Sequence, residues 1–144
     1  MKFFYFEPEV AGGIGPKSDM DNSVWPPRIR KLQYVFDGWL GDAILESFPC
    51  FIVTDVAAKA LLREGLTGFE LDDVEVSVSE LFRELYPGQE LPVFRWLKIT
   101  GEPGVDDFGV GADHRLVVSE RVTRTLQAFG IKKAITKPSE LYEN

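Results

Sequence analysis

Apolar and polar positions along the chain first predict four strands. Bulky apolar residues dominate residues 2–7 (KFFYFE) and 32–36 (LQYVF). A continuous apolar run at residues 50–53 (CFIV) is typical of a strand buried on both faces. Residues 93–100 (VFRWLKIT) have strand character, but both of their faces mix polar and apolar side chains, so we expect this strand near a sheet edge or under partial cover.

The pattern also contains one arrangement twice. Residues 51–65 align without gaps with residues 116–130, at an offset of 65 residues. Each copy has an apolar strand, then a hydroxyl residue that caps a helix (Thr54 or Ser119), then an acid that complements the helix dipole. Apolar residues follow at helical spacing, a glycine ends the helix, and another apolar stretch comes next. The sequence therefore predicts two strand–helix–strand units.

Shorter elements are predicted between and around these units. Residues 79–86 follow capping serines and predict a helix, and residues 40–47 favour a second short helix. Residues 11–23 are rich in Gly and predict a long Gly/Pro-rich loop, while residues 138–144 predict a frayed tail. We expect residues 1–144 to form a single α+β domain with a mixed or antiparallel sheet and about three helices.

Composition agrees with this fold class. A chain of 144 residues with 44% hydrophobic and 27% charged residues is typical of one globular domain. The single cysteine, Cys50, excludes an intramolecular disulfide and a cysteine-based zinc site. The N-terminus lacks the apolar run of a signal peptide, and no stretch reaches the length of a membrane helix. We therefore expect a cytoplasmic protein.

Charge is distributed unevenly along the chain. The formal net charge is −7, but residues 37–114 carry −11, whereas residues 1–36 carry +1 and residues 115–144 carry +3. Nucleic acid is disfavoured as a partner, because phosphate binding needs clustered Lys and Arg. An acidic surface instead steers a basic protein toward it and disfavours wrong partners. A merely solubilising surface is the alternative interpretation of the same block.

The motifs that suggest catalysis are weak. Residues 12–18 (GGIGPKS) differ from a phosphate-binding loop, because a proline separates the glycine from the lysine. Cys50 begins an apolar run and should be buried. His114 is the only histidine, and the sequence has no G-x-S-x-G motif that would supply a nucleophilic serine for it. Adjacent carboxylates such as Asp72 and Asp73 point to opposite faces of a strand. We predict a protein that is not an enzyme and holds no cofactor or metal.

Several segments resemble a known protein family. The resemblance rests on residues 36–42, 45–54, 68–74, 94–97 and 116–121. These stretches resemble a predicted immunity-protein family of bacterial polymorphic toxin systems. The resemblance implies a protein that binds a cognate toxin in the cytoplasm and blocks it by steric occlusion, without chemistry of its own. Some relatives carry paired Cys-x-x-Cys metal motifs, which this sequence lacks.

If the resemblance holds, the acidic block is the surface that meets a basic toxin. The acids expected to form this face are Glu70, Asp72, Asp73, Glu75, Asp106 and Asp107. Trp39 follows a turn and is either an aromatic anchor of the interface or a core residue. Two other classes stay open: a small-molecule-binding or regulatory domain with residues 11–23 as a lid, and a hydrolase that uses carboxylates.

Overall fold

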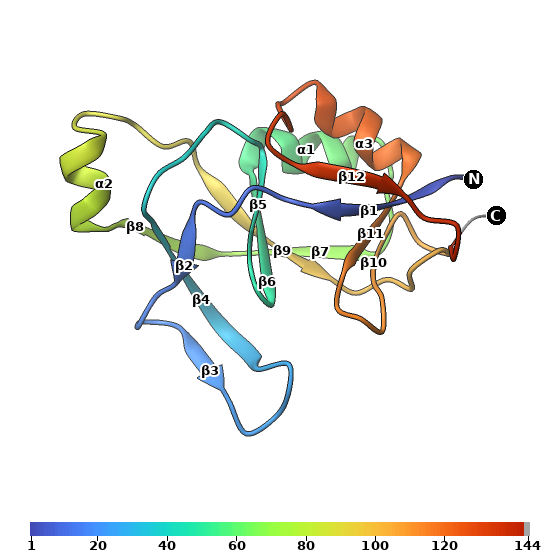
Figure 1. The fold of residues 1–144 in the computed structure, drawn as a ribbon, viewed down its shortest axis with the longest axis horizontal. Helices are drawn as coiled ribbons and strands as arrows, with labels where there is room; N and C mark the ends of the chain where they lie inside the picture. The colour runs from blue at the N-terminus through green and yellow to red at the C-terminus, as the bar shows by residue number, and fades with distance from the viewer. Residues whose placement is uncertain (143–144) are drawn as a thin grey trace.

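Figure 1 shows the computed structural model, which describes residues 1–142. Three helices and twelve strands in this part of the chain form an α+β fold, as predicted. In chain order the elements are β1 (Phe3–Glu7), β2 (Gly12–Ile14), β3 (Asp19–Asp21), β4 (Arg28–Phe36), β5 (Ile44–Ser47), β6 (Cys50–Thr54), α1 (Asp55–Arg63), β7 (Phe69–Asp72), β8 (Val74–Val78), α2 (Glu80–Leu85), β9 (Phe94–Ile99), β10 (Phe108–Val110), β11 (Leu116–Ser119), α3 (Glu120–Gln127) and β12 (Ile135–Pro138).

Two of the sheets have the same topology. One has the strand order β5-β6-β9-β7 and the other has the order β10-β11-β1-β12. In each sheet an antiparallel hairpin leads into a helix, and the strand after the helix runs parallel to the strand before it. One antiparallel strand, β9 or β1, lies between those two strands. The predicted strand–helix–strand units are therefore confirmed, and each is split by an inserted strand.

The first strand of the chain completes the second unit. Ser119 at the end of β11 pairs with Phe3 in β1, as Thr54 at the end of β6 pairs with Phe94 in β9. In both units the first helical residue donates its backbone N–H to the residue just before the inserted strand, at 2.8 Å and 3.1 Å. The similarity seen in the sequence thus extends to strands that the alignment did not include.

Local signals begin and end the two helices as predicted. Thr54 and Ser119 each accept a hydrogen bond from the backbone N–H three residues later, at 3.4 Å and 3.3 Å. Gly65 and Gly130 follow the helices with φ of +68° and +99°, a region in which a residue with a Cβ is strained. Within residues 1–142, no helix has the length and apolar character needed to cross a bilayer.

Two apolar cores hold the layers together. Helices α1 and α3 pack side by side (Figure 1) and cover the first core, which contains Phe6, Ile44, Leu61, Phe108, Val122 and Leu126. The second core lies on the other face of β6 and β9 and contains Leu32, Tyr34, Phe36, Ile52, Phe82 and Trp96. Strand β9 lies between β6 and the edge strand β7 and is partly covered, which agrees with the expectation for residues 93–100. Both faces of β9 carry apolar side chains because each face packs against a different core.

A third sheet corrects the loop expected at residues 11–23. Strands β2 and β3, each three residues long, fall within this segment and pair antiparallel with β4. The opposite edge of β4 pairs in parallel with β8. Gly and Asp in this segment favour turns locally, but β4 supplies backbone partners that local propensity does not take into account.

The helix expected at residues 40–47 is also wrong. Residues Ile44–Ser47 form β5, which pairs antiparallel with β6. This pairing leaves Ile44 and Leu45 with no exposed surface, one in each core. Burial of two large apolar side chains outweighs the small difference in helix propensity.

The C-terminal segment is better held than the expected frayed tail. Pro138 belongs to β12, and the buried Ser139 donates its N–H to the Phe3 carbonyl at 2.9 Å. The Tyr142 N–H donates to the Ser139 hydroxyl at 3.3 Å, and its ring packs edge-on against Tyr5. Residues 138–142 are therefore part of the packed structure, and residues 143 and 144 lie outside the described part of the chain.

Candidate functional site

Four of the predicted acids lie along β7, β8 and the residue that joins them. Glu70, Asp72, Asp73 and Glu75 are all exposed, and we call them the acidic edge. Three of them contact bases: Asp72 with the half-buried Lys98 at 3.3 Å, Asp73 with the half-buried Arg95 at 3.7 Å and Glu75 with the exposed Lys17 at 3.5 Å. The acidic edge therefore carries less net charge than its sequence suggests, although exposed ion pairs of this kind are weak.

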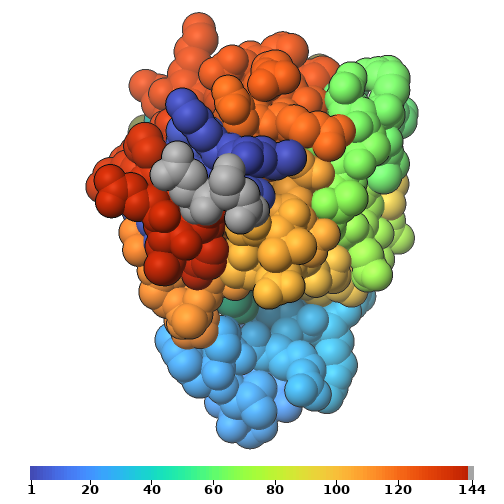
Figure 2. Space-filling model, turned by 90° about the vertical axis from the view of Figure 1, so that its right-hand side faces the viewer, coloured from blue at the N-terminus to red at the C-terminus, as the bar shows by residue number. Residues whose placement is uncertain are grey.

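The backbone of β7 is open on one side. β7 is the last strand of its sheet, and Gly68, just before it, accepts a hydrogen bond from the Thr100 N–H at 2.8 Å. Because inward and outward groups alternate in an antiparallel pair, the N–H and C=O of Phe69 and Leu71 face away from β9. Figure 2 shows residues of this region, in green, along one side of the molecule.

Asp106 and Asp107 do not extend the acidic edge as predicted. Asp106 is half-buried and accepts a hydrogen bond from the Glu102 N–H at 2.8 Å. Asp107 is only 5% exposed, and its carboxylate accepts hydrogen bonds from the Thr67 N–H at 2.9 Å and the Ser119 hydroxyl at 2.6 Å. A buried carboxylate is retained when such donors replace water, so Asp107 has a structural role.

Asp42 has a matching role that the sequence analysis missed. Its carboxylate is 1% exposed and accepts the N–H groups of Lys133 and Ala134, both at 2.9 Å. Asp107 thus joins the hairpin of the second unit to the segment after α1, and Asp42 joins the hairpin of the first unit to the segment after α3. The sequence does contain a signal for both residues: an acid lies just before the first strand of each hairpin, and the two acids match when the hairpins are aligned.

Trp39 is half-buried rather than fully presented to a partner. Its indole N–H donates to the Asp42 carbonyl at 2.9 Å, and its ring packs edge-on against Phe94. The side chain therefore contributes to the second core, where the polar end of the ring is satisfied internally.

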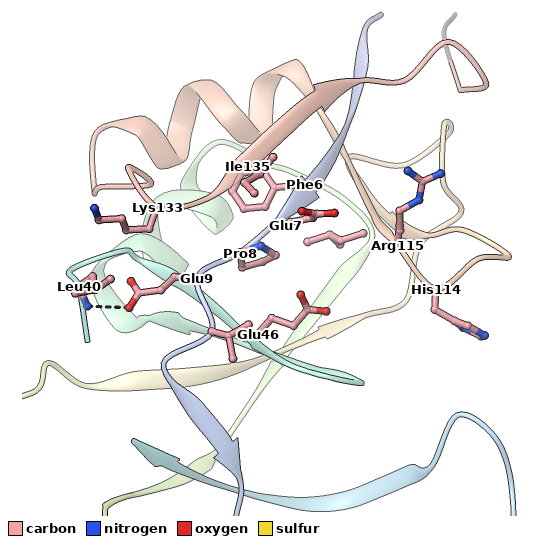
Figure 3. A pocket seen from close by; sticks show the side chains of 12 residues that line it. Phe6, Glu7, Pro8, Glu9, Leu40, Glu46, His114, Arg115, Lys133 and Ile135 are labelled. Carbon is pink, nitrogen blue, oxygen red and sulfur yellow. Dashed lines mark hydrogen bonds between the residues drawn. The ribbon is translucent and has the colours of Figure 1, made fainter. Parts of the chain in front are cut away.

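A charged hollow lies apart from the acidic edge (Figure 3). It has a volume of about 610 Å³ and lies between β1, β5, β12 and the turn before β11. The charged or titratable residues that line it are Glu7, Glu9, Glu46, His114, Arg115 and Lys133. The sequence analysis did not single out the three glutamates, because Glu46 is far in sequence from Glu7 and Glu9 and only the fold brings them together.

Most of these charged groups already have partners or point away. Glu9 accepts hydrogen bonds from the backbone N–H of Leu40 at 2.7 Å and of Asp42 at 3.2 Å. Arg115 pairs with Asp113 at 2.6 Å and lies over a tyrosine ring. Figure 3 shows the side chains of Arg115 and Lys133 directed away from Glu46.

Glu46 differs from its neighbours. Within residues 1–142 its carboxylate has no hydrogen-bond donor and no ion-pair partner, although the side chain is half-buried. Burial raises the pKa of Glu46 above its ordinary value, and the negative charge of Glu7 raises it further. Partial burial without a donor disfavours the charged form of this carboxylate, which is the main cause of the raised pKa.

Cys50 and His114, which the sequence analysis considered and set aside as catalytic groups, are not arranged for catalysis in the structure. Burial raises the pKa of the Cys50 thiol to about 12, so the reactive thiolate is scarce at neutral pH. His114 is exposed in a turn with φ of +67° and packs edge-on against Phe48. Among residues 1–142, no three His, Cys, Asp or Glu side chains are grouped so that they could hold a metal ion.

Comparison with known proteins adds no further assignment. No protein-family model, curated protein or solved structure significantly matches this chain.

The unpartnered carboxylate predicts a specific dependence of stability on pH. Folding raises the pKa of Glu46, so between its ordinary value of 4.5 and its folded value the folded state holds more protons than the unfolded state. Stability therefore falls as pH rises through this window. Glu46→Gln should raise the free energy of unfolding at pH 7, and the gain should vanish below pH 4.5. Urea titrations at several pH values measure this, with Glu84→Gln on exposed α2 as control; an equal gain in both variants would contradict it.

Proposed function

We propose that this protein is a cytoplasmic immunity protein that binds a basic toxin domain along the acidic edge and occludes it. The observation that carries the proposal is the open strand β7, with exposed acids at Glu70, Asp72 and Asp73. An open strand offers unpaired backbone groups to another chain, and side chains on it add selectivity. The proposed mechanism is steric, and no residue of this chain performs chemistry in it.

The ion pairs at the acidic edge fit this mechanism. Lys98 and Arg95 hold the carboxylates of Asp72 and Asp73 on the surface of the free protein. The Asp73 N–H and then Lys98 lower the pKa of Asp72 below its ordinary value, which favours the charged form of this group. Each exposed pair is worth about 0–1 kcal/mol, so a partner's Lys or Arg replaces it at little cost.

Charge reversal at the acidic edge tests the proposal. We expect Glu70→Lys, Asp72→Lys and Asp73→Lys together to weaken binding to the toxin domain encoded beside this gene by at least about tenfold and to flatten its salt dependence. Growth of cells that express the toxin should then be lost. Binding is measured by calorimetry at two salt concentrations, after circular dichroism shows that the variant is folded.

A matched control makes the same change of charge elsewhere. Glu84→Lys, Glu90→Lys and Glu140→Lys alter exposed acids outside the acidic edge and should preserve binding and growth. Equal protection by both triple variants would overturn the role of the acidic edge. A neighbouring gene that encodes no toxin would count against the immunity function itself.

A second candidate, binding of a small molecule, is favoured by the charged hollow. Its volume of about 610 Å³ falls within the range of about 300–1,000 Å³ that is typical of ligand sites. None of residues 11–23 lines this hollow, so the lid considered for this class does not cover it. Glu7 and Glu46 line this hollow and accept no hydrogen bond within residues 1–142, which also keeps the carboxylate hydrolase as a lesser form of the same candidate.

A further inference from the structure

Three aromatic side chains from distant segments form a row on the surface. Trp25 lies between β3 and β4, Phe48 lies in the β5–β6 turn, and His114 lies in the turn before β11. The ring centroids of Trp25 and Phe48 are 5.5 Å apart, and those of Phe48 and His114 are 6.0 Å apart. We call these three residues the aromatic row.

The side chains of the aromatic row are more exposed than is usual for aromatic residues. Trp25 is 76% exposed and Phe48 is 41% exposed, and Met20 and Val24 add exposed apolar surface to the same hairpin. Figure 2 shows this hairpin, in light blue, projecting from one end of the molecule. Large aromatic side chains that remain in water while held in place are typical anchors of protein–protein interfaces.

A small apolar hollow opens beside the row. It has a volume of about 170 Å³ and is lined by Phe48, Phe51, Val110 and neighbouring prolines. Glu46 and His114 line both this hollow and the larger charged one. A group that enters here therefore meets apolar walls on one side and the carboxylate of Glu46 on the other.

The negative charge of Glu46 is not paired within the described chain. Glu46 has no partner within the described chain, and Glu7 is close enough to raise its pKa. Figure 3 shows both carboxylates reaching into the charged hollow from β1 and β5, while the guanidinium of Arg115 points away. Arg115 already attracts the carboxylate of Glu7, and a positive group from outside would pair directly with Glu46 and lessen its repulsion with Glu7.

We propose that the aromatic row and Glu46 bind a segment of another protein that carries an arginine next to an apolar residue. The guanidinium pairs with Glu46 and Glu7, and the apolar neighbour packs in the small hollow against Phe48 and Trp25. Arginine fits better than lysine, because its planar group bonds a carboxylate with two N–H groups and stacks on aromatic rings. This surface shares no residue with the acidic edge, so it stands apart from the function proposed above.

A pair of synthetic peptides tests the arginine requirement. The probes are the blocked peptide Gly-Leu-Arg-Leu-Gly and its citrulline counterpart, which has nearly the same shape and no charge. Titrated into the isotopically labelled full chain, the arginine peptide should shift the amide signals of Glu46, Phe48 and His114 and the indole signal of Trp25. The citrulline peptide should bind about tenfold more weakly, as expected for loss of a charge-assisted pair.

Variants assign the binding to the proposed residues. Glu46→Gln should weaken the arginine peptide about tenfold while folding at least as well as the parent, and Trp25→Ala should weaken both peptides. Glu84→Gln, on exposed α2, should leave both affinities unchanged. Equal affinity for the two peptides, no loss on Glu46→Gln, or signal shifts confined to β7 and β8 would each overturn the proposal, and the last would point to the acidic edge instead.

Discussion

Replacing Phe108 by alanine is expected to lower the free energy of unfolding by about 3–5 kcal/mol, the usual range for a buried phenylalanine. Phe108 has no exposed surface and belongs to the core beneath both helices. Its ring packs edge-on against Phe69 of the other unit, and its N–H donates to the Thr67 carbonyl at 3.1 Å. The cavity would therefore open where the two units meet.

Urea denaturation monitored by circular dichroism measures this loss. Leu62→Ala on α1 is the matched control, because Leu62 is 59% exposed and alanine suits a helix at least as well. We expect the control to change stability by less than about 1 kcal/mol. A similarly small loss for Phe108→Ala would mean that the junction between the units does not contribute to cooperative folding.

Removing the buried carboxylate of Asp107 is expected to cost about 2–4 kcal/mol, because charge-assisted hydrogen bonds are lost and their donors stay buried. Asp107→Ala leaves the Thr67 N–H and the Ser119 hydroxyl without their acceptor. Ser119 also caps α3, so the start of that helix should loosen. Thermal and urea unfolding of the variant measure the effect.

The same variant separates two roles for Asp107. Asp73→Ala removes an acid whose side chain is 97% exposed and should leave stability almost unchanged, while it weakens binding to a basic partner. Asp107→Ala should do the reverse: it should lower stability and leave the affinity of the folded fraction unaltered. Loss of affinity in a fully folded Asp107→Ala protein would return this residue to the binding surface.

Expectations that depend on local chemistry are confirmed by the structure. Thr54 and Ser119 cap helices, and Gly65 and Gly130 end them, because capping bonds and left-handed turns involve residues that are close in sequence. The strands before the two helices are continuous apolar runs, and burial on both faces follows directly from such runs.

Predictions are wrong more often for strands that form by pairing with a distant segment. Strands β2, β3 and β5 have three or four residues each and exist through pairing with β4 or β6. The inserted strand β1 lies more than a hundred residues from β11, its partner. A short segment without long-range contacts has no preference strong enough to identify it as a strand.

The candidate sites show the same difference between features that depend on local chemistry and features that depend on distant partners. The sequence places a net charge of −11 on residues 37–114. In the structure Asp42 and Asp107 are buried and hydrogen-bonded, and three acids of the acidic edge contact bases from other segments. Neither the half-buried Glu46 nor the exposed Trp25 has a signature in the sequence. Solvent exposure and electrostatic partners depend on how the segments pack, and the type of a residue does not determine that packing.

The sequence by itself determined the α+β class, the two strand–helix–strand units and the acidic character of the middle of the chain. These follow from hydrophobic period, capping residues and charge, which act over a few neighbouring residues. Only the tertiary structure decided that β1 completes the second unit, that Asp107 is internal, and that Glu46 meets the aromatic row. Each of those outcomes depends on hydrogen bonds and burial between segments far apart in the chain, where the energy of pairing exceeds local preference.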